Sequence, residues 1–166
     1  LVAFAATKTA ELVALWESVG FVHGVLNTDN FQISGETMDF GPFAFVQGYD
    51  VDFSPNLSDR AGRYRLRKQA DAAEFAINRL SSGLSGQFGG SGRDGALLFR
   101  QVYEEERLRL FCEKLALPLE DLDMVDSSLK YLAETKGDFT SFFARLCHGK
   151  IDSSSFHDEW RRRRRL

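Results

Sequence analysis

The chain has 166 residues, of which 43% are hydrophobic and 27% are charged, a composition typical of one globular domain with its own core. The formal net charge of −3 provides no basic field for nucleic acid. No apolar stretch approaches the ~20 residues that span a bilayer. We therefore expect neither nucleic-acid nor membrane partners. Cys112 and Cys147 form no CxxC pair, which favours a reducing compartment: the bacterial cytoplasm, or the mitochondrion in a eukaryote.

The first predicted element is a helix over residues 7–19, with Thr7 or Thr9 as its N-cap and Gly20 at its end. Its apolar positions share one face: Leu12, Val13, Trp16 and Val19. Residues 21–46 contain short β-like pieces broken by Gly, Asn, Asp and Pro, which indicate loops and a small hairpin. Residues 47–67 are expected to form an ordered but irregular loop.

The rest of the chain is predicted to be helical. A helix over 69–82 is expected to bury Ala73, Phe75, Ala76, Ile77 and Leu80. The Gly/Ser-rich stretch 83–95 is typical of a flexible surface connection. Further helices are expected at about 96–116, 119–135, 138–147 and 153–164, with Pro118 at a helix start and Gly137 at a helix stop. The predicted fold is mainly α with a small β-hairpin. The candidate catalytic and metal-binding loops are expected within residues 1–68, and residues 69–166 are expected to form the helical part of the same domain.

The expected hairpin suggests a metal site. Residues 31–33 and 36–38 can pair around a two-residue Ser34-Gly35 turn, which would place Asn30 directly opposite Asp39. One amide oxygen and one carboxylate at that spacing suit Mg²⁺, which takes oxygen ligands and keeps other positions for phosphates and water. The sequence therefore predicts Asn30 and Asp39 as metal ligands; a three-residue turn would move this pairing.

A run of basic residues lies at the end of the irregular loop 47–67. Arg63, Arg65, Arg67 and Lys68 alternate along the chain. A solvated loop edge is the favoured interpretation, and contact with a phosphate or nucleic acid stays open.

The spacing of polar residues is also that of a kinase-type site. Asp39-Phe40-Gly41 is a DFG triplet, and His23 opens an eight-residue loop that ends at Asn30. Protein kinases bind Mg²⁺ through the equivalent Asn and Asp. Val25 stands where kinases have their catalytic Asp, and an acid lies instead at Asp29. His23 is expected to brace the loop.

With these departures from the kinase pattern, the sequence resembles one family. The segments GFVHGVLNTDN (20–30), DFGPF (39–43) and NLSDRAGRY (56–64) are similar to GFxHGVMNTDN, DYGPF and NHSDxxGRY of the selenoprotein O, or YdiU, family. Weaker similarity continues in DFTSFFARL (138–146) and SFHDEWRRR (155–163). Leu57 departs from the family His. The resemblance implies a protein-kinase-like C-terminal lobe, and the Gly-rich loop, strand Lys and helix Glu of an N-lobe do not precede it.

The resemblance also implies an activity. Members of this family bind ATP and Mg²⁺, or Mn²⁺, and transfer AMP to Ser, Thr or Tyr hydroxyls of protein substrates. Asp29 then matches the proton acceptor, Asn30 and Asp39 match the metal ligands, and Asp39 also lies against the nucleotide phosphates. Without an N-lobe the isolated chain is expected to be inactive. Two alternatives stay open: a non-catalytic pseudokinase-like binding module or truncated remnant, and an atypical kinase that transfers phosphate.

Overall fold

A computed structural model describes residues 1–88, 92–119, 121–148 and 155–163. This part of the chain forms six α-helices, two short 3₁₀ helices and a two-stranded antiparallel sheet, which confirms the mainly helical class with a small β element. In chain order the elements are α1 (Val2–Ser18), β1 (Phe21–Val22), η1 (Thr28–Asn30), β2 (Ala44–Phe45), η2 (Leu66–Lys68), α2 (Gln69–Phe88), α3 (Gly92–Lys114), α4 (Leu122–Thr135), α5 (Phe139–Cys147) and α6 (Ser155–Arg163). Within these residues, no helix has both the length and the apolar character needed to cross a bilayer.

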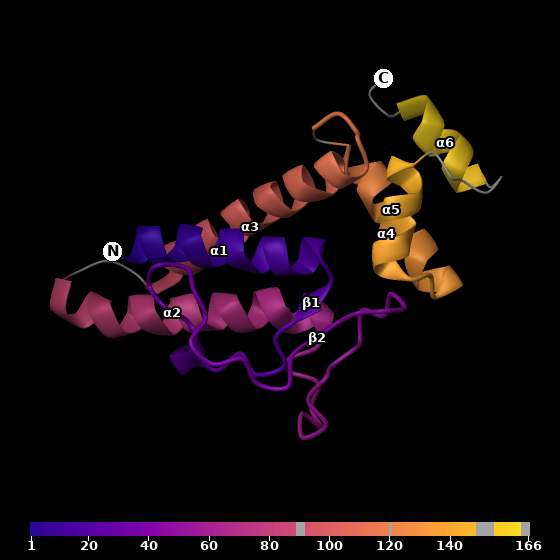
Figure 1. Ribbon diagram of the computed structural model, residues 1–166. Helices are drawn as coiled ribbons and strands as arrows, with labels where there is room; N and C mark the ends of the chain where they lie inside the picture. Colours follow the sequence, from indigo (N-terminus) through magenta and orange to yellow (C-terminus); the bar gives the residue numbers. More distant parts are fainter. Residues whose placement is uncertain (89–91, 120, 149–154, 164–166) are drawn as a thin grey trace.

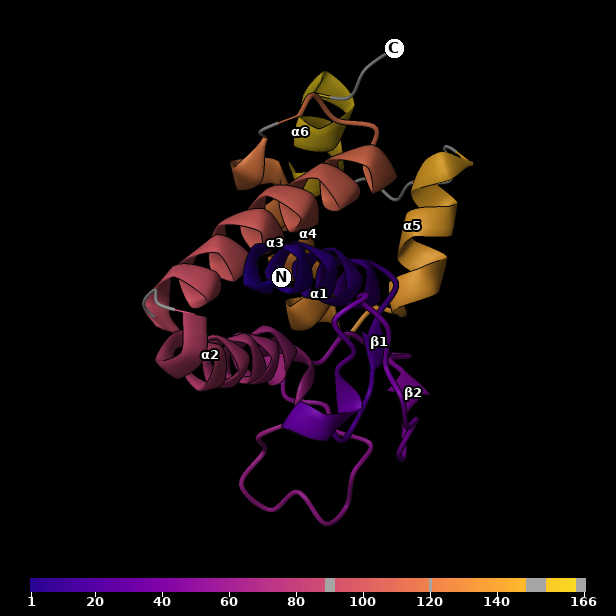
Figure 2. The same ribbon diagram turned by 90° about the vertical axis from the view of Figure 1, so that its left-hand side faces the viewer.

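Helix α1 lies between α2 and α3 and contacts both (Figures 1 and 2). Its buried face is built largely from small side chains, Ala5, Ala6, Ala10 and Ala14, which let neighbouring helices approach closely. Larger apolar groups complete this core: Val13, Trp16, Phe21, Leu26, Ile77 and Phe99. The core therefore ties α1 and the start of the loop region to the α2–α3 helix pair.

A second core lies at the C-terminal end of α3, where α4, α5 and α6 gather (Figure 1). The Trp160 indole of α6 donates to the Leu115 carbonyl at 2.8 Å. Helices α4 and α5 begin at conventional caps, because the side chains of Asp121 and Asp138 accept from backbone N–H groups of the first turn. Long helix α3 contributes to both cores and so joins the two ends of the molecule.

Several sequence-based boundaries need correction. Helix α1 begins at Val2, five residues before the predicted start, so neither Thr7 nor Thr9 is its N-cap. Val19 is 41% exposed although it was expected on the buried face. Helix α4 starts at Leu122 and not close to Pro118, since Asp121 provides the cap.

The Gly/Ser-rich stretch is mostly helical and not a flexible connection. Helix α2 continues to Phe88 and α3 begins at Gly92; residues 89–91 lie outside the described part. One of these glycines, Gly95, is explained by packing, because a Cβ at this position would lie 2.6 Å from Cγ1 of Val2. The glycine permits close packing of α3 on α1, a property that composition alone does not distinguish from flexibility.

A half-buried ion pair connects α1 to α3. The Arg107 Nε lies 2.9 Å from Glu17 Oε1, with the two side chains 16% and 15% exposed. The Tyr103 hydroxyl also donates to Glu17. Burial disfavours the charged form of Arg107, but the Glu17 carboxylate outweighs it and raises the Arg107 pKa. Removing one partner would leave the other charge poorly solvated.

We therefore expect Glu17→Gln to lower the free energy of unfolding by about 2–3 kcal/mol, below the usual cost for a fully buried pair because some solvent reaches this one. Glu11→Gln is the matched control, since Glu11 pairs with Lys8 on the exposed side of the same helix. Its expected cost is below about 0.5 kcal/mol. Urea unfolding of the two variants measures both, and equal costs would contradict a stabilising role for the Glu17 network.

Candidate active site

The predicted hairpin register is wrong by one residue. Phe31 bridges Thr37 in antiparallel fashion, and the Met38 N–H donates to the Asn30 carbonyl at 3.2 Å. Asn30 therefore lies opposite Met38 and not opposite Asp39. The direct cross-strand opposition that predicted a shared metal does not occur.

The turn explains the shift. It contains three residues, 33–35, closed by a hydrogen bond of 3.0 Å from the Gln32 N–H to the Glu36 carbonyl. Gly35 has φ of +82°, the left-handed conformation that the last position of a three-residue hairpin loop favours. A two-residue turn was the wrong choice for the Ser34-Gly35 pair, and one extra loop residue moves every pairing beyond it.

His23 connects the two segments in place of that pairing. Its Nδ1 accepts from the Val25 N–H at 3.3 Å, so Nδ1 carries no proton and Nε2 does. Nε2 then donates to Thr37 Oγ1 at 2.8 Å, and the Thr37 hydroxyl donates to the Asn30 carbonyl at 3.0 Å. This chain of hydrogen bonds confirms the loop-bracing role predicted for His23.

The surroundings of His23 also locate the DFG segment. Burial lowers the pKa of His23 and keeps the ring neutral, while the negative charge of nearby Asp39 acts in the opposite direction. The Phe40 ring stacks on the imidazole with 5.8 Å between centroids. His23 therefore lies between the loop that ends at Asn30 and the segment that carries Asp39.

The two predicted metal ligands lie in different surroundings. The Asn30 Nδ2 donates to the Val25 carbonyl at 2.9 Å, and within the described residues no donor satisfies its Oδ1. The Asp39 carboxylate is exposed. No group of three or more His, Cys, Asp or Glu side chains suited to a metal occurs in the described part of the chain. One amide oxygen and one carboxylate fit Mg²⁺ that takes its remaining ligands from phosphate and water.

The segment 56–64 holds the loop from the other side. Asn56 Nδ2 donates to the Gly24 carbonyl at 3.0 Å, and the Tyr64 hydroxyl donates to Asn27 Oδ1 at 2.5 Å. The Asp59 carboxylate accepts from two backbone N–H groups later in the segment. Each contact is made by a residue of the NLSDRAGRY motif, so this motif shapes the backbone around the loop.

Gln69 is a residue that sequence reasoning missed. Its side chain is 1% exposed and forms two buried hydrogen bonds, one from the His23 N–H to Oε1 and one from Nε2 to the Phe21 carbonyl, both 2.9 Å. These bonds attach β1 to the start of α2, directly before the loop that ends at Asn30. A single polar residue at a helix start carries no sequence signal for this role.

We expect Gln69→Ala to destabilise the chain by about 2–4 kcal/mol, because two buried backbone groups lose their partners. Gln101→Ala is the control: Gln101 is an exposed helix residue that bonds only Glu105, and its replacement should cost less than about 0.5 kcal/mol. Chemical denaturation of both variants provides the comparison. A cost for Gln69→Ala no larger than the control's would contradict the assignment.

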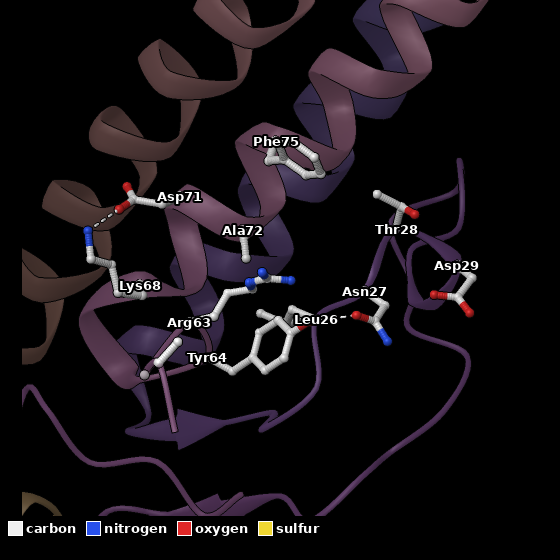
Figure 3. A pocket seen from close by; sticks show the side chains of 12 residues that line it. Leu26, Asn27, Thr28, Asp29, Arg63, Tyr64, Lys68, Asp71, Ala72 and Phe75 are labelled. Carbon is white, nitrogen blue, oxygen red and sulfur yellow. Dashed lines mark hydrogen bonds and ion pairs between the residues drawn. The ribbon is translucent and has the colours of Figure 1, made fainter. Parts of the chain in front are cut away.

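A pocket of about 740 Å³ lies between the loop, the 61–64 segment and the start of α2 (Figure 3). Asp29 lines this pocket and is exposed, whereas Asn30 and Asp39 do not line it. Phe75, expected in the core, is 55% exposed and lines the pocket instead. The predicted catalytic acid is thus on a cavity, and the predicted metal ligands lie outside it. The lining residues are Leu26, Asn27, Thr28, Asp29, Ala61, Gly62, Arg63, Tyr64, Lys68, Asp71, Ala72 and Phe75.

Most of the basic run near this pocket is paired. Arg65 and Arg67 lie 3.0 and 2.7 Å from the Asp52 carboxylate, and Lys68 lies 2.8 Å from Asp71. These partners are exposed, so each pair contributes little stability, but each neutralises a charge that sequence reasoning left open for phosphate.

Comparisons with known proteins agree with the loop motifs. Residues 3–163 match the family described as Protein adenylyltransferase SelO. The chain is 38% identical over 143 residues to Protein nucleotidyltransferase YdiU of Pseudomonas fluorescens, covering 84% of this chain and 29% of that protein. It is 39% identical over 159 residues to the protein of the same name from Cytophaga hutchinsonii, covering 92% of this chain and 31% of that protein. The chain thus spans less than a third of these relatives' length, and it belongs to the SelO, or YdiU, family.

Proposed function

We propose that this chain provides the metal-binding and proton-accepting loops of an ATP- and Mg²⁺-dependent protein adenylyltransferase, which transfers AMP to Ser, Thr or Tyr hydroxyls. The observation that carries the proposal is the hydrogen-bonded chain His23–Thr37–Asn30, which holds the Asn30 loop against the DFG segment. The order of α1, loop, hairpin, DFG and helices supports a kinase-like C-terminal lobe. Membership of the family described as Protein adenylyltransferase SelO supports nucleotidyl transfer.

Asn30 and Asp39 are the residues that would hold the divalent cation. Their unpaired amide oxygen and exposed carboxylate suit Mg²⁺, with Mn²⁺ as an alternative. The cation would neutralise phosphate charge when bound. Asn30 contributes orientation as well, since its amide is fixed by the Val25 carbonyl.

Asp29 is the proposed proton acceptor. The oxygen of the target hydroxyl attacks the α-phosphorus of ATP, the bond from this phosphorus to the pyrophosphate oxygen breaks, and the hydroxyl proton passes to the Asp29 carboxylate. AMP is then esterified to the protein and pyrophosphate leaves. Asp29 is exposed on the pocket, where a hydroxyl-bearing segment can reach it.

We infer that other parts of the reaction need segments that the relatives have outside the matched region. The relatives are more than three times as long as the region matched here. The elements that grip the nucleotide from the other side are proposed to lie there, so the isolated chain should not transfer AMP.

The test uses the full-length parent with Mg²⁺, a protein acceptor and ATP labelled at either the α- or the γ-phosphate. Covalent label from α-labelled ATP alone is the expected result. Label from γ-labelled ATP would instead identify a phosphate-transferring kinase. ATP binding with neither label transferred would favour a non-catalytic binding module.

A further inference from the structure

We propose that the pocket beside Asp29 is the acceptor site, and that it selects a peptide segment with an acidic side chain close to the target hydroxyl. This inference rests on the proposed function and extends it to the class of protein substrate. It follows from the side chains that line one cavity and from the charges among them that are already paired.

The first step is the position of the cavity relative to the predicted ligands. Asp29 lines it, but Asn30 and Asp39 do not. A group in the pocket therefore lies beside Asp29, at the edge of the cavity, whereas the proposed cation ligands Asn30 and Asp39 are not part of its lining. Asn30 directly follows Asp29 in the chain, so a hydroxyl beside Asp29 would lie next to the loop that is proposed to hold the cation.

The second step is the charge of Arg63. Among the described residues Arg63 has no ion pair, in contrast to its basic neighbours in the same run. Its backbone is fixed by a hydrogen bond of 2.9 Å from its N–H to Asp59 Oδ1. Figure 3 shows the guanidinium extending into the space between α2 and the 26–29 segment. Arg63 is exposed, and a guanidinium can bind a carboxylate through two parallel hydrogen bonds.

The third step compares a carboxylate with a phosphate as the group that the pocket would bind. Asp29 and Asp71 also line the pocket; in the described part of the chain Asp71 is paired with Lys68 and Arg100, whereas Asp29 has no ion pair. A multiply charged phosphate would be repelled by Asp29, while one carboxylate on Arg63 leaves Asp29 available to a neutral hydroxyl. One positive and one negative side chain, Arg63 and Asp29, thus favour a peptide that carries both an acidic side chain and a hydroxyl.

The fourth step is the apolar part of the pocket lining. Phe75 is 55% exposed on α2, with the Arg79 guanidinium 4.9 Å from its ring centroid. Ala72 and Leu26 continue this surface inside the pocket. An exposed aromatic ring in a cavity contributes contact area at little entropic cost, so it suits an apolar side chain of the same peptide.

The test measures peptide binding to the full-length parent by fluorescence anisotropy, which needs no turnover. The probes are fluorescein-labelled peptides in which one Glu is moved stepwise around a central Ser, together with the matched Gln peptides. We expect at least one Glu peptide to bind up to about fivefold more tightly than its Gln partner, the gain of one exposed guanidinium–carboxylate pair. Arg63→Glu should remove this preference and create one for the matched Lys peptide.

Arg60→Glu is the matched control, because Arg60 is exposed on the same segment, undergoes the same change in charge and does not line the pocket. The Glu preference should survive in this variant. Equal binding of Glu and Gln peptides by the unmodified parent would overturn the inference. So would a loss of ATP binding in Arg63→Glu with the peptide preference retained, which would assign Arg63 to the nucleotide. Charge-dependent peptide binding without AMP transfer would support a site for acidic peptides but reject the proposed function, and with it the role of this site as the acceptor site.

Discussion

Replacing Asp29 with Asn in the full-length parent is expected to slow AMP transfer by about 10²–10⁴-fold, the usual contribution of a positioned proton acceptor. Asn keeps the size of the side chain but cannot accept the hydroxyl proton. ATP binding should be unchanged, because the predicted nucleotide contacts are made by other residues. The readout is label transfer from α-labelled ATP at saturating ATP, so that only the chemical step is compared.

Asp126→Asn is the control for this change. Asp126 is exposed on α4, away from the pocket, and its replacement makes the same alteration in charge. We expect full activity in this variant. Unchanged activity in Asp29→Asn would remove Asp29 from the chemistry, and a parallel loss of ATP binding would assign it to nucleotide binding.

The helices could be predicted from sequence because their information is local. Apolar spacing located α2 to α6, although the N-terminal boundary residues proposed from sequence, Thr7 or Thr9 and Pro118, were wrong and α2 runs six residues past its predicted end at residue 82. Gly95 looked like part of a linker, yet it allows α3 to approach Val2 of α1. A contact between residues so distant along the chain leaves no mark on local composition.

The sequence proposed the residue types of the candidate site, but its hairpin register was wrong. Spacing suggested Asn30 and Asp39, and one extra loop residue changed which side chains face each other. The link that joins their segments, from His23 through Thr37, combines a ring nitrogen, a hydroxyl and a backbone carbonyl. Only His23 had been given a bracing role from sequence.

The pocket could not have been predicted. It is formed by three segments, one of which is distant in sequence from the other two. Phe75, a large apolar side chain that lines it, was assigned from sequence to the buried face of a helix. Helical periodicity places Phe75 beside the core, but an edge position on an amphipathic helix can turn toward solvent or a cavity depending on the neighbouring loop. That loop is the NLSDRAGRY segment, whose own conformation depends on Asp59 and Asn56.

Replacing Asp39 with Asn should have the other large effect, a fall in AMP transfer of about 10³-fold, or about 4 kcal/mol of lost transition-state stabilisation. The variant keeps an oxygen atom but removes the negative charge that a divalent cation requires. The Mg²⁺-dependent part of ATP affinity should be lost with it, measured by titrating ATP with and without Mg²⁺.

Loop collapse would be a competing cause for the same loss of activity, and the surroundings of His23 argue against it. The Asp39 charge acts to raise the pKa of His23, so removing it strengthens the neutral state that burial already favours. The His23–Thr37–Asn30 hydrogen bonds should therefore persist, and the unfolding midpoint of Asp39→Asn should match that of Asp50→Asn, a change at an exposed acid in the 47–67 segment. Label transfer that survives Asp39→Asn unchanged would contradict the metal role, whereas activity lost together with stability would assign Asp39 to holding the loop.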